Sequence, residues 1–193
     1  MSVAGFVLAG GRSRRMGRDK ALLPYGDATL LEHALATLRD VCDDVVIAGS
    51  RDDLSAFAPV IADEFVECGP LGGMHAALAQ SQLDWNLFLA VDMPRVTAEH
   101  LHKLLAQPRS VSTRAVFAQA GGRLQPLCGL YHRELAGKMA QALAEGKRAV
   151  IPVLESITDA HGLLRVDFED AAAFLNMNTP EDMATLGVNE PST

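Results

Sequence analysis

The amino-acid sequence predicts an α/β protein of three layers, in which helices cover both faces of a mostly parallel central sheet. The first strand is expected over residues 4–8, a short and fully apolar run that ends in glycines, as buried parallel strands do. Similar runs alternate with amphipathic segments through the first hundred residues. This alternation is typical of a parallel sheet wrapped by helices.

The remaining elements of the first half follow from periodicity and capping signals. Three further strands are predicted over residues 44–48, 59–62 and 86–91. Helices are predicted from Thr29 to near Asp40, over residues 53–57, over residues 74–80, and after Thr97. The helix at Thr29 begins with a capping box, because Glu32 follows three residues later. In sheets of this kind, ligands bind at the carboxyl ends of the strands.

The second half has weaker signals. Residues 115–120 and 124–131 flank the dipeptide Gly121-Gly122, a pattern that predicts a hairpin. A helix is expected over residues 134–143, and the apolar run at 174–177 is interpreted as a strand. We therefore predict a single domain over residues 1–188, followed by a frayed tail at 189–193.

Composition excludes several classes of protein. The hydrophobic fraction of 49% argues against disorder, and no apolar run reaches the length that spans a bilayer. The net charge of −7 argues against nucleic acid as a partner. The three cysteines are dispersed without metal-ligand spacing, as in proteins of a reducing compartment. A cytoplasmic protein without a membrane partner is expected.

Residues 10–20 form a glycine- and arginine-rich loop directly after the first strand. The loop holds 5 of the 17 Lys and Arg residues, among them Arg15 and Lys20. Glycines such as Gly10 and Gly11 let backbone N–H groups approach a phosphate, and the cations neutralise it. The loop matches neither the P-loop nor the dinucleotide-binding glycine pattern, which argues against an ATPase and a dehydrogenase. A phosphate site of another kind is predicted here.

Polar side chains at strand ends are the next candidates. Asp92 follows the run 86–91 and precedes Met93-Pro94, so its carboxylate is expected at the lip of the sheet, where Mg²⁺ bridging triphosphate oxygens would be held. A turn-forming role is the alternative for Asp92, and Asp63 ends the third strand in the same way. The glycine-rich turn that contains Gly69 either is a plain loop or supplies backbone N–H groups that bind a base or phosphate. Asn176 and Asn178 are expected on one face of the last strand, as ligands or as turn formers.

Taken together, these segments resemble the molybdenum cofactor guanylyltransferases, which make molybdopterin guanine dinucleotide. The resemblance covers almost the whole chain in the expected order, and it is carried by LAGGRSRRMGRDK (residues 8–20), GPLGGM (69–74), VDMP (91–94), QPL (125–127) and NMNTPE (176–181). The first segment alone specifies only the wider nucleotidyltransferase superfamily. The resemblance implies a Rossmann-like nucleotidyltransferase fold with Mg²⁺ as cofactor.

The resemblance also implies roles for particular residues. Residues that match nucleotide-binding positions are Leu8, Ala9 and Gly10 for the nucleotide, Lys20 for its phosphates, Asp63 for the base or ribose, and Asp92 for Mg²⁺. Asn176 and Asn178 match a segment near the pterin and the reacting phosphates. The loop arginines, Arg15 among them, would offset phosphate charge.

The choice of guanine depends on Gly10, since cytidylyltransferase relatives usually carry alanine at this position. The sequence departs from the family directly after the second strand, where some members have an asparagine that touches the nucleotide; the stretch here is AGSR (residues 48–51), in which Ser50 is the candidate substitute. No family role is carried over for Cys68.

The expected partners are GTP, molybdopterin or the molybdenum cofactor, and molybdoenzyme apoproteins or their chaperones. Three alternatives stay open: a cytidylyltransferase for the same pterin, a sugar-phosphate nucleotidyltransferase, and a non-catalytic protein that delivers the cofactor.

Overall fold

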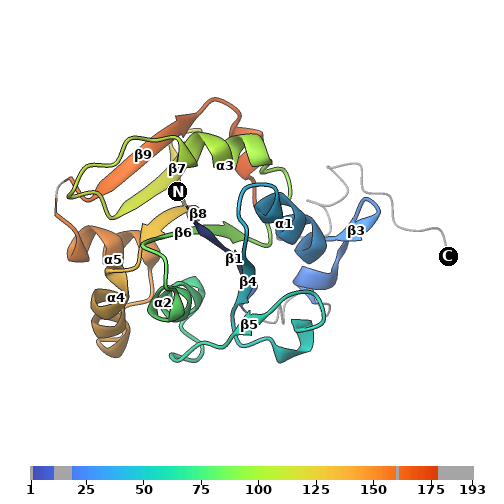
Figure 1. Ribbon diagram of the computed structural model, residues 1–193, viewed down its shortest axis with the longest axis horizontal. Helices are drawn as coiled ribbons and strands as arrows, with labels where there is room; N and C mark the ends of the chain where they lie inside the picture. The colour runs from blue at the N-terminus through green and yellow to red at the C-terminus, as the bar shows by residue number, and fades with distance from the viewer. Residues whose placement is uncertain (1, 11–18, 160, 178–193) are drawn as a thin grey trace.

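A computed structural model of the protein describes residues 2–10, 19–159 and 161–177. Within these residues the chain forms a seven-stranded sheet between two layers of helices (Figure 1). The strand order is β5-β4-β1-β6-β8-β7-β9. The strands of this sheet are β1 (Ala4–Leu8), β4 (Val45–Ala48), β5 (Val60–Ile61), β6 (Trp85–Ala90), β7 (Ala115–Ala120), β8 (Arg123–His132) and β9 (Leu163–Phe168). Strands β2 (Pro24–Tyr25) and β3 (Ala28–Thr29) form a separate small hairpin.

Helices cover both faces of the sheet. The α-helices are α1 (Leu30–Arg39), α2 (Pro70–Gln80), α3 (Ala98–Leu105), α4 (Leu135–Ala144) and α5 (Val150–Ile157). Short 3-10 helices are η1 (Lys20–Leu22), η2 (Asp52–Leu54) and η3 (Ala171–Phe174). One hydrophobic core lies under α1 and α3, and a second lies under α2, α4 and α5. The predicted three-layer α/β architecture is therefore confirmed.

Strand β1 shows how the sequence builds both cores at once. Its side chains alternate between the two faces, so Val7 joins the core under α1 whereas Phe6 and Leu8 join the core under α2. Phe6 stacks on Phe88 of the neighbouring strand with ring centroids 5.2 Å apart. Each such side chain contributes about 1.5–3 kcal/mol when fully buried.

The pairing of strands is mostly parallel, as predicted. Strand β1 pairs in parallel with both β4 and β6, and β7 pairs in parallel with β9. Strand β8 runs antiparallel to its neighbours β6 and β7. The hairpin expected around Gly121-Gly122 is confirmed, since both glycines have positive φ angles of 55° and 73° between β7 and β8. The carboxyl ends of β1, β4 and β6 thus meet at one edge of the sheet.

The capping box predicted for the first helix is present. Thr29 Oγ1 accepts a hydrogen bond from the Glu32 N–H at 3.2 Å, and the Thr29 N–H donates to Glu32 Oε2 at 2.8 Å. This arrangement satisfies two N–H groups that have no partner inside the helix. It also fixes the direction in which the chain leaves the β2–β3 hairpin.

The glycine-rich segment before the predicted helix 74–80 is itself helical. Helix α2 begins at Pro70 and includes Gly72 and Gly73, so the expectation of a turn over these residues is wrong. Pro70 stands at the first helical position, where its missing N–H would have had no partner. A Cβ atom on Gly72 would lie 2.9 Å from the Phe65 carbonyl oxygen, so the glycine lets the loop after β5 pack against the helix.

Helix α5 and strand β9 have no counterpart in the predictions. Pro152 lies within the apolar run 150–157 and argues against a helix, yet it is the third residue of α5, where backbone N–H groups have no intrahelical partner. Leu164, Val166 and Phe168 alternate with Arg165 and Asp167 along β9, which is a strand signal that periodicity analysis passed over.

The strand predicted at residues 174–177 is absent from the structure. Phe174 is instead the last residue of η3. The Asp170 carboxylate caps the start of this 3-10 helix by accepting hydrogen bonds from the N–H groups of Ala172 and Ala173. Leu175, Asn176 and Met177 follow without strand pairing. The short helix and this segment carry the chain back to the loop after β6.

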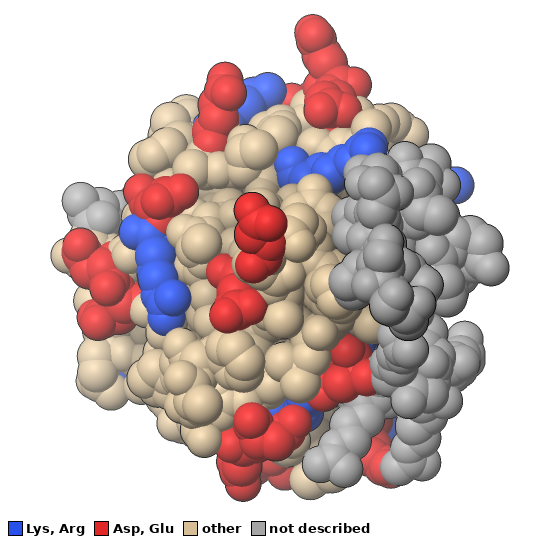
Figure 2. Space-filling view, turned by 90° about the vertical axis from the view of Figure 1, so that its right-hand side faces the viewer, with Lys and Arg blue, Asp and Glu red and all other residues tan. Residues whose placement is uncertain are grey.

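Charges on the surface follow the composition. Figure 2 shows Asp and Glu side chains distributed over one face of the molecule and interspersed with Lys and Arg, in keeping with the net charge of −7. In the part of the chain that the structure describes, no helix combines the length and the hydropathy needed to cross a membrane.

Candidate active site

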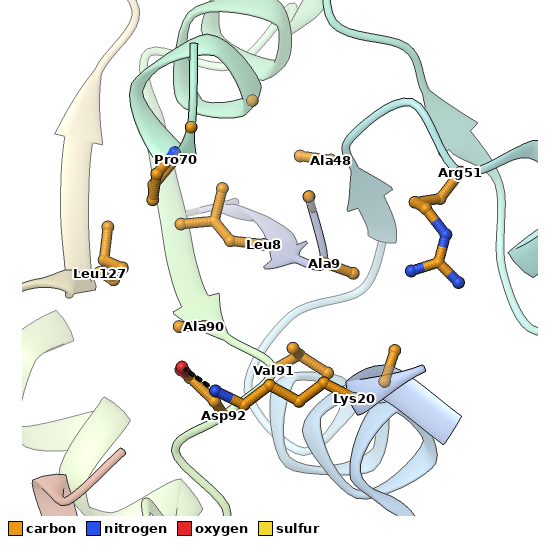
Figure 3. Close-up of a pocket in the computed structure, with 14 residues that line it drawn as sticks. Leu8, Ala9, Lys20, Ala48, Arg51, Pro70, Ala90, Val91, Asp92 and Leu127 are labelled. Atoms are coloured by element: carbon orange, nitrogen blue, oxygen red, sulfur yellow. Dashed lines mark hydrogen bonds and ion pairs between the residues drawn. The ribbon is translucent and has the colours of Figure 1, made fainter. Parts of the chain in front are cut away.

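A cavity of about 260 Å³ opens at the carboxyl ends of β1, β4 and β6. Arg51 lies on one side of it and Leu127 and Pro70 lie on the other, with Lys20 and Asp92 along one edge (Figure 3). The cavity is lined by residues from strand ends and loops: Leu8, Ala9, Gly10, Lys20, Ala21, Ala48, Arg51, Gly69, Pro70, Gly73, Ala90, Val91, Asp92 and Leu127. This is the edge at which ligands bind in parallel α/β sheets.

Lys20 and Asp92 form an ion pair at this cavity. Lys20 Nζ donates to Asp92 Oδ2 at 2.8 Å, and the two side chains are 14% and 18% exposed. Lys20 is the first residue of η1, and Asp92 stands two residues beyond the end of β6. The structure thus brings together two residues that the sequence assigned to the same site from distant motifs.

The second carboxylate oxygen of Asp92 has no hydrogen-bond partner within the described residues, although it is buried. The backbone around it is fixed, because the Asp92 carbonyl accepts from the Met177 N–H at 2.9 Å and the Val91 N–H donates to the Leu8 carbonyl at 3.1 Å. A buried carboxylate oxygen without a partner is costly unless a cation or donor satisfies it. Asp92 therefore suits a divalent cation.

A complete protein cage for such a cation is not required. Among residues 2–10, 19–159 and 161–177, no three His, Cys, Asp or Glu side chains are grouped so as to hold a metal. Mg²⁺ commonly binds through one or two carboxylates and completes its coordination with substrate phosphates and water. The single carboxylate at the cavity edge fits that mode of binding.

Asp63 lies behind the cavity wall. A Cβ atom on Gly10 would lie 4.0 Å from Asp63 Oδ2, and a Cβ atom on Gly73 would lie 3.5 Å from its Oδ1. Oδ1 is buried without a hydrogen-bond partner within the described residues, and burial raises the pKa of the Asp63 carboxyl above its ordinary value. Ser50 Oγ accepts from the Asp63 N–H at 3.1 Å, so the residue that departs from the family pattern holds the backbone of Asp63.

The backbones after β1 and β4 approach each other closely. Gly49 has a φ of 141°, and a Cβ atom on it would lie 2.9 Å from Gly10 Cα. Glycine at position 49 is therefore required by both conformation and contact. Position 10 differs, because the nearest atoms that a Cβ atom there would meet in the described part of the chain, its sequence neighbours aside, are 4.0 Å away. Gly10 keeps open a space that a methyl group would occupy.

Sequence analysis missed Arg51, which lines the cavity from just after β4. Its side chain is 2% exposed and forms ion pairs with Asp19 and Asp53. The hydrogen bond with Asp53 is the largest contribution that raises the pKa of the Arg51 guanidinium. The available signal was a cation directly after a predicted parallel strand, at the edge where ligands bind.

Leu127 reaches the cavity through an irregularity in β8. The pairing of β8 with β7 shifts between Phe117 and Ala118, which leaves residues 126–128 of β8 without partners on β7. The Tyr131 hydroxyl, fully buried, donates to the Pro126 carbonyl within this bulge. The bulge redirects the side chain of Leu127 toward the site, a known use of such irregularities.

Of the remaining predicted site residues, the structure describes Asn176 and Gly69. Asn176 is exposed, and it stands next to Met177, whose N–H bonds the Asp92 carbonyl. Gly69 precedes α2 with a φ of 65° and lines the cavity. Gly11, Arg15 and Asn178 lie outside the described residues.

Comparison with known proteins agrees with this geometry. The family model of the MobA-like NTP transferase domain matches residues 5–160. A protein from Aliivibrio salmonicida named molybdenum cofactor guanylyltransferase is 36% identical over 186 residues, which cover 94% of this chain and 93% of the relative.

Solved structures give the same result. The structure of molybdopterin-guanine dinucleotide biosynthesis protein A from Archaeoglobus fulgidus superposes with a TM-score of 0.74 at 26% identity, covering 95% of this chain and 96% of the other. The 2-C-methyl-D-erythritol 4-phosphate cytidylyltransferase from Thermus thermophilus has a TM-score of 0.68 at 19% identity over 96% of each chain and shares the fold. The chain is thus a nucleotidyltransferase of the MobA-like NTP transferase domain family, and within it belongs to the molybdenum cofactor guanylyltransferases.

Proposed function

We propose that this protein transfers GMP from GTP to molybdopterin, with Mg²⁺, to form molybdopterin guanine dinucleotide and pyrophosphate. The observation that carries the proposal is the Lys20–Asp92 pair at the edge of the cavity. It combines a cation suited to a triphosphate with a carboxylate whose buried oxygen has no partner within the described residues. The family of the chain supports the same reaction.

The reaction joins two anions, so its main barrier is electrostatic. An oxygen of the pterin's terminal phosphate attacks the α-phosphorus of GTP, the bond from this phosphorus to the bridging oxygen of the β-phosphate breaks, and pyrophosphate leaves. Positioning and charge neutralisation supply most of the rate in transfers of this type.

Lys20 serves the triphosphate in this proposal. Its Nζ lies at the cavity edge, held by Asp92 in the structure, and it would exchange part of that contact for phosphate oxygens. The cation then offsets the repulsion between the two substrates and the charge on the departing pyrophosphate. Arg15, which lies outside the described residues, is proposed to act on the same phosphates.

Asp92 is proposed to hold Mg²⁺ through the oxygen that lacks a protein partner within the described residues. When bound, the cation neutralises triphosphate oxygens and favours the leaving group. The main-chain contacts from Met177 and Ala90 to the Asp92 loop keep the carboxylate at the end of β6. The carboxylate therefore needs little rearrangement to accept the cation.

Nucleotide selection is proposed to rest on the ends of β1 and β5. Leu8, Ala9 and Gly10 line the cavity and would contact the nucleotide, with Gly11 continuing the same loop. Asp63, behind Gly10, would contact the base or ribose. Contacts from Gly69 to the nucleotide, and from Asn176 and Asn178 to the pterin and the reacting phosphates, complete the proposed site.

The proposed partners are GTP, molybdopterin or its metal-containing form, and molybdoenzyme apoproteins or their chaperones. A cytoplasmic location is proposed, because Cys42, Cys68 and Cys128 are all free and buried, as thiols in a reducing compartment are. We also propose that residues 1–188 act as one domain.

Incubation of the protein with Mg²⁺, each of GTP, CTP, ATP and UTP, and either molybdopterin or a sugar phosphate as the acceptor tests the proposal. We expect pyrophosphate and the dinucleotide to form with GTP. Preference for CTP would indicate a cytidylyltransferase, and transfer only to a sugar phosphate would indicate the second alternative. Nucleotide binding without pyrophosphate release would indicate a delivery protein and contradict the proposal.

A further inference from the structure

Arg51 is a buried cation for which the proposed reaction has no use. Its Nη1 donates to Asp19 Oδ1 at 3.2 Å, and its Nη2 donates to Asp19 Oδ2. The same guanidinium donates through Nε and Nη2 to the Asp53 carboxylate at 3.0 and 2.8 Å. One side chain therefore clamps two carboxylates that come from different segments of the chain.

Stability alone does not account for this clamp. Desolvation of a buried ion pair cancels much of its Coulombic attraction, so apolar residues of similar volume often stabilise a protein as well or better. The Arg51 side chain is 2% exposed, whereas Asp19 is 25% and Asp53 44% exposed, so most of the desolvation cost of these pairs falls on the guanidinium. A role in placing other groups explains the arrangement better.

Asp19 connects Arg51 to the site. The Asp19 carboxylate accepts from the Ala21 N–H at 3.1 Å and thereby caps η1. Lys20, the first residue of η1, follows Asp19 directly and extends its Nζ to Asp92. Two ion pairs, Arg51–Asp19 and Lys20–Asp92, are thus joined through the backbone at the start of η1, which connects the end of β4 to the end of β6.

We propose that Arg51 is a positioning residue that fixes, through Asp19, the direction in which Lys20 presents its ammonium group to the triphosphate. Arg51 anchors this path to the end of β4, which pairs with β1 on one side and β5 on the other. The inference rests on the proposed function, since it assigns Lys20 to the triphosphate of GTP. It adds Arg51 to the site as a residue that affects GTP only through the position of Lys20.

The side-chain chemistry allows a sharp test. Arg51→Lys keeps the charge but loses the planar fork that holds both Asp19 oxygens. Asp19→Asn removes the charge on the other partner and keeps the shape. Because a misdirected Lys20 ammonium group loses part of a charge-assisted hydrogen bond to phosphate, we expect each variant to weaken GTP binding by about 10-fold in titration calorimetry with Mg²⁺.

Asp53→Asn is the matched control. Asp53 shares the guanidinium of Arg51 but belongs to η2 and not to the segment that carries Lys20, and its side chain is 44% exposed. We expect this variant to lower the thermal midpoint and to keep GTP affinity within about twofold of the wild type, because both hydrogen bonds from Arg51 to Asp19 remain and the asparagine amide oxygen can still accept from the guanidinium.

A double-mutant cycle with Lys20→Ala tests whether Arg51 acts through Lys20. If Arg51 acts through Lys20, Arg51→Lys weakens GTP binding about 10-fold in the wild-type background and less than about twofold when combined with Lys20→Ala. An equal loss in both backgrounds would overturn the proposal, because it would assign Arg51 either a direct contact with GTP or a general role in folding. Circular dichroism checks the fold, and Asp19→Asn carries the test if Arg51→Lys does not fold.

The readout also separates this inference from the proposed function. GTP binding is measured without any acceptor, so a wild-type protein that binds GTP but forms no dinucleotide contradicts the proposed function and leaves the coupling measurable. Normal dinucleotide formation together with unchanged GTP affinity in Arg51→Lys would contradict the inference alone.

Discussion

Lys20 Nζ lies 2.8 Å from Asp92 Oδ2, although the two residues are 72 positions apart in the sequence. The pair joins the end of the glycine-rich loop to the end of β6 at the rim of the cavity. Each partner keeps the other's charge compensated until the substrate arrives with its own charges. Both side chains are therefore positioned at the rim of the cavity before the substrate binds.

Replacing Lys20 with alanine should weaken GTP binding. A charged hydrogen bond to a phosphate contributes roughly 1.5–3 kcal/mol, so we expect the dissociation constant to rise by about 10- to 100-fold in calorimetry with Mg²⁺. Lys138→Ala serves as the control, since Lys138 lies on α4 and donates to the Ile157 carbonyl at the end of α5, and neither residue lines the cavity. Equal GTP affinity in Lys20→Ala and the wild type would remove Lys20 from the site.

Replacing Gly10 with alanine should change the choice of base and not the fold. The new Cβ atom would lie 4.0 Å from Asp63 Oδ2 and from Gly49 Cα, in ordinary van der Waals contact. We expect the thermal midpoint to stay near that of the wild type and the preference for GTP over CTP to fall, by the roughly 10- to 200-fold that a pocket gains from one methyl group.

Gly137→Ala is the matched control for that experiment. Gly137 lies in α4, and an added Cβ atom would have no atom of the described residues outside its own helix turn within 4 Å. Alanine should therefore stabilise the helix by up to about 1 kcal/mol and leave nucleotide preference unchanged. If Gly10→Ala discriminates between GTP and CTP as the wild type does, the base is selected elsewhere.

Asp63 should make stability depend on pH. Burial raises the pKa of its carboxyl in the folded state, so the folded protein binds more protons than the unfolded chain between the ordinary and the raised pKa. The contribution of Asp63 to the free energy of unfolding is thus present at low pH and is lost as pH rises through this window. Above the window, the ionised carboxylate destabilises the fold.

Asp63→Asn should therefore be more stable than the wild type at neutral pH, by about 1 kcal/mol, the lower end of the cost of an unsatisfied buried group. The advantage should vanish at a pH below the ordinary pKa of aspartate. Urea unfolding followed by fluorescence of Trp85, the one tryptophan of the chain, measures both. A stability advantage that is the same at all pH values would contradict this account of Asp63.

Local signals in the sequence were enough to predict much of the fold. The capping box of Thr29 and Glu32, the apolar run of β1 and the Gly121-Gly122 hairpin depend on neighbours close in sequence, and all three are present. The strand expected at residues 174–177 is absent, because Phe174 belongs to η3, whose start is capped by Asp170, and residues 175–177 have no strand pairing.

Long-range contacts could not be predicted in this way. The ion pair of Arg51 with Asp19 joins residues 32 positions apart, and the bulge that brings Leu127 to the cavity depends on the register between β7 and β8. The approach of Gly49 to Gly10 arises from the packing of two parallel strands. Motif analysis could name Lys20 and Asp92, whereas the side chains that place them became visible only in three dimensions.

The most direct test of the proposed reaction compares the wild type with Asp92→Asn, which keeps the shape of the side chain and removes its charge. Both are incubated with molybdopterin, GTP and Mg²⁺, and the dinucleotide and pyrophosphate are quantified. We expect equimolar products from the wild type and a loss of at least about 100-fold in Asp92→Asn, as for other groups that stabilise charge in the transition state. Circular dichroism should show the same fold for both proteins. Wild-type rates in Asp92→Asn, or GTP binding by the wild type without pyrophosphate release, would contradict the proposed mechanism.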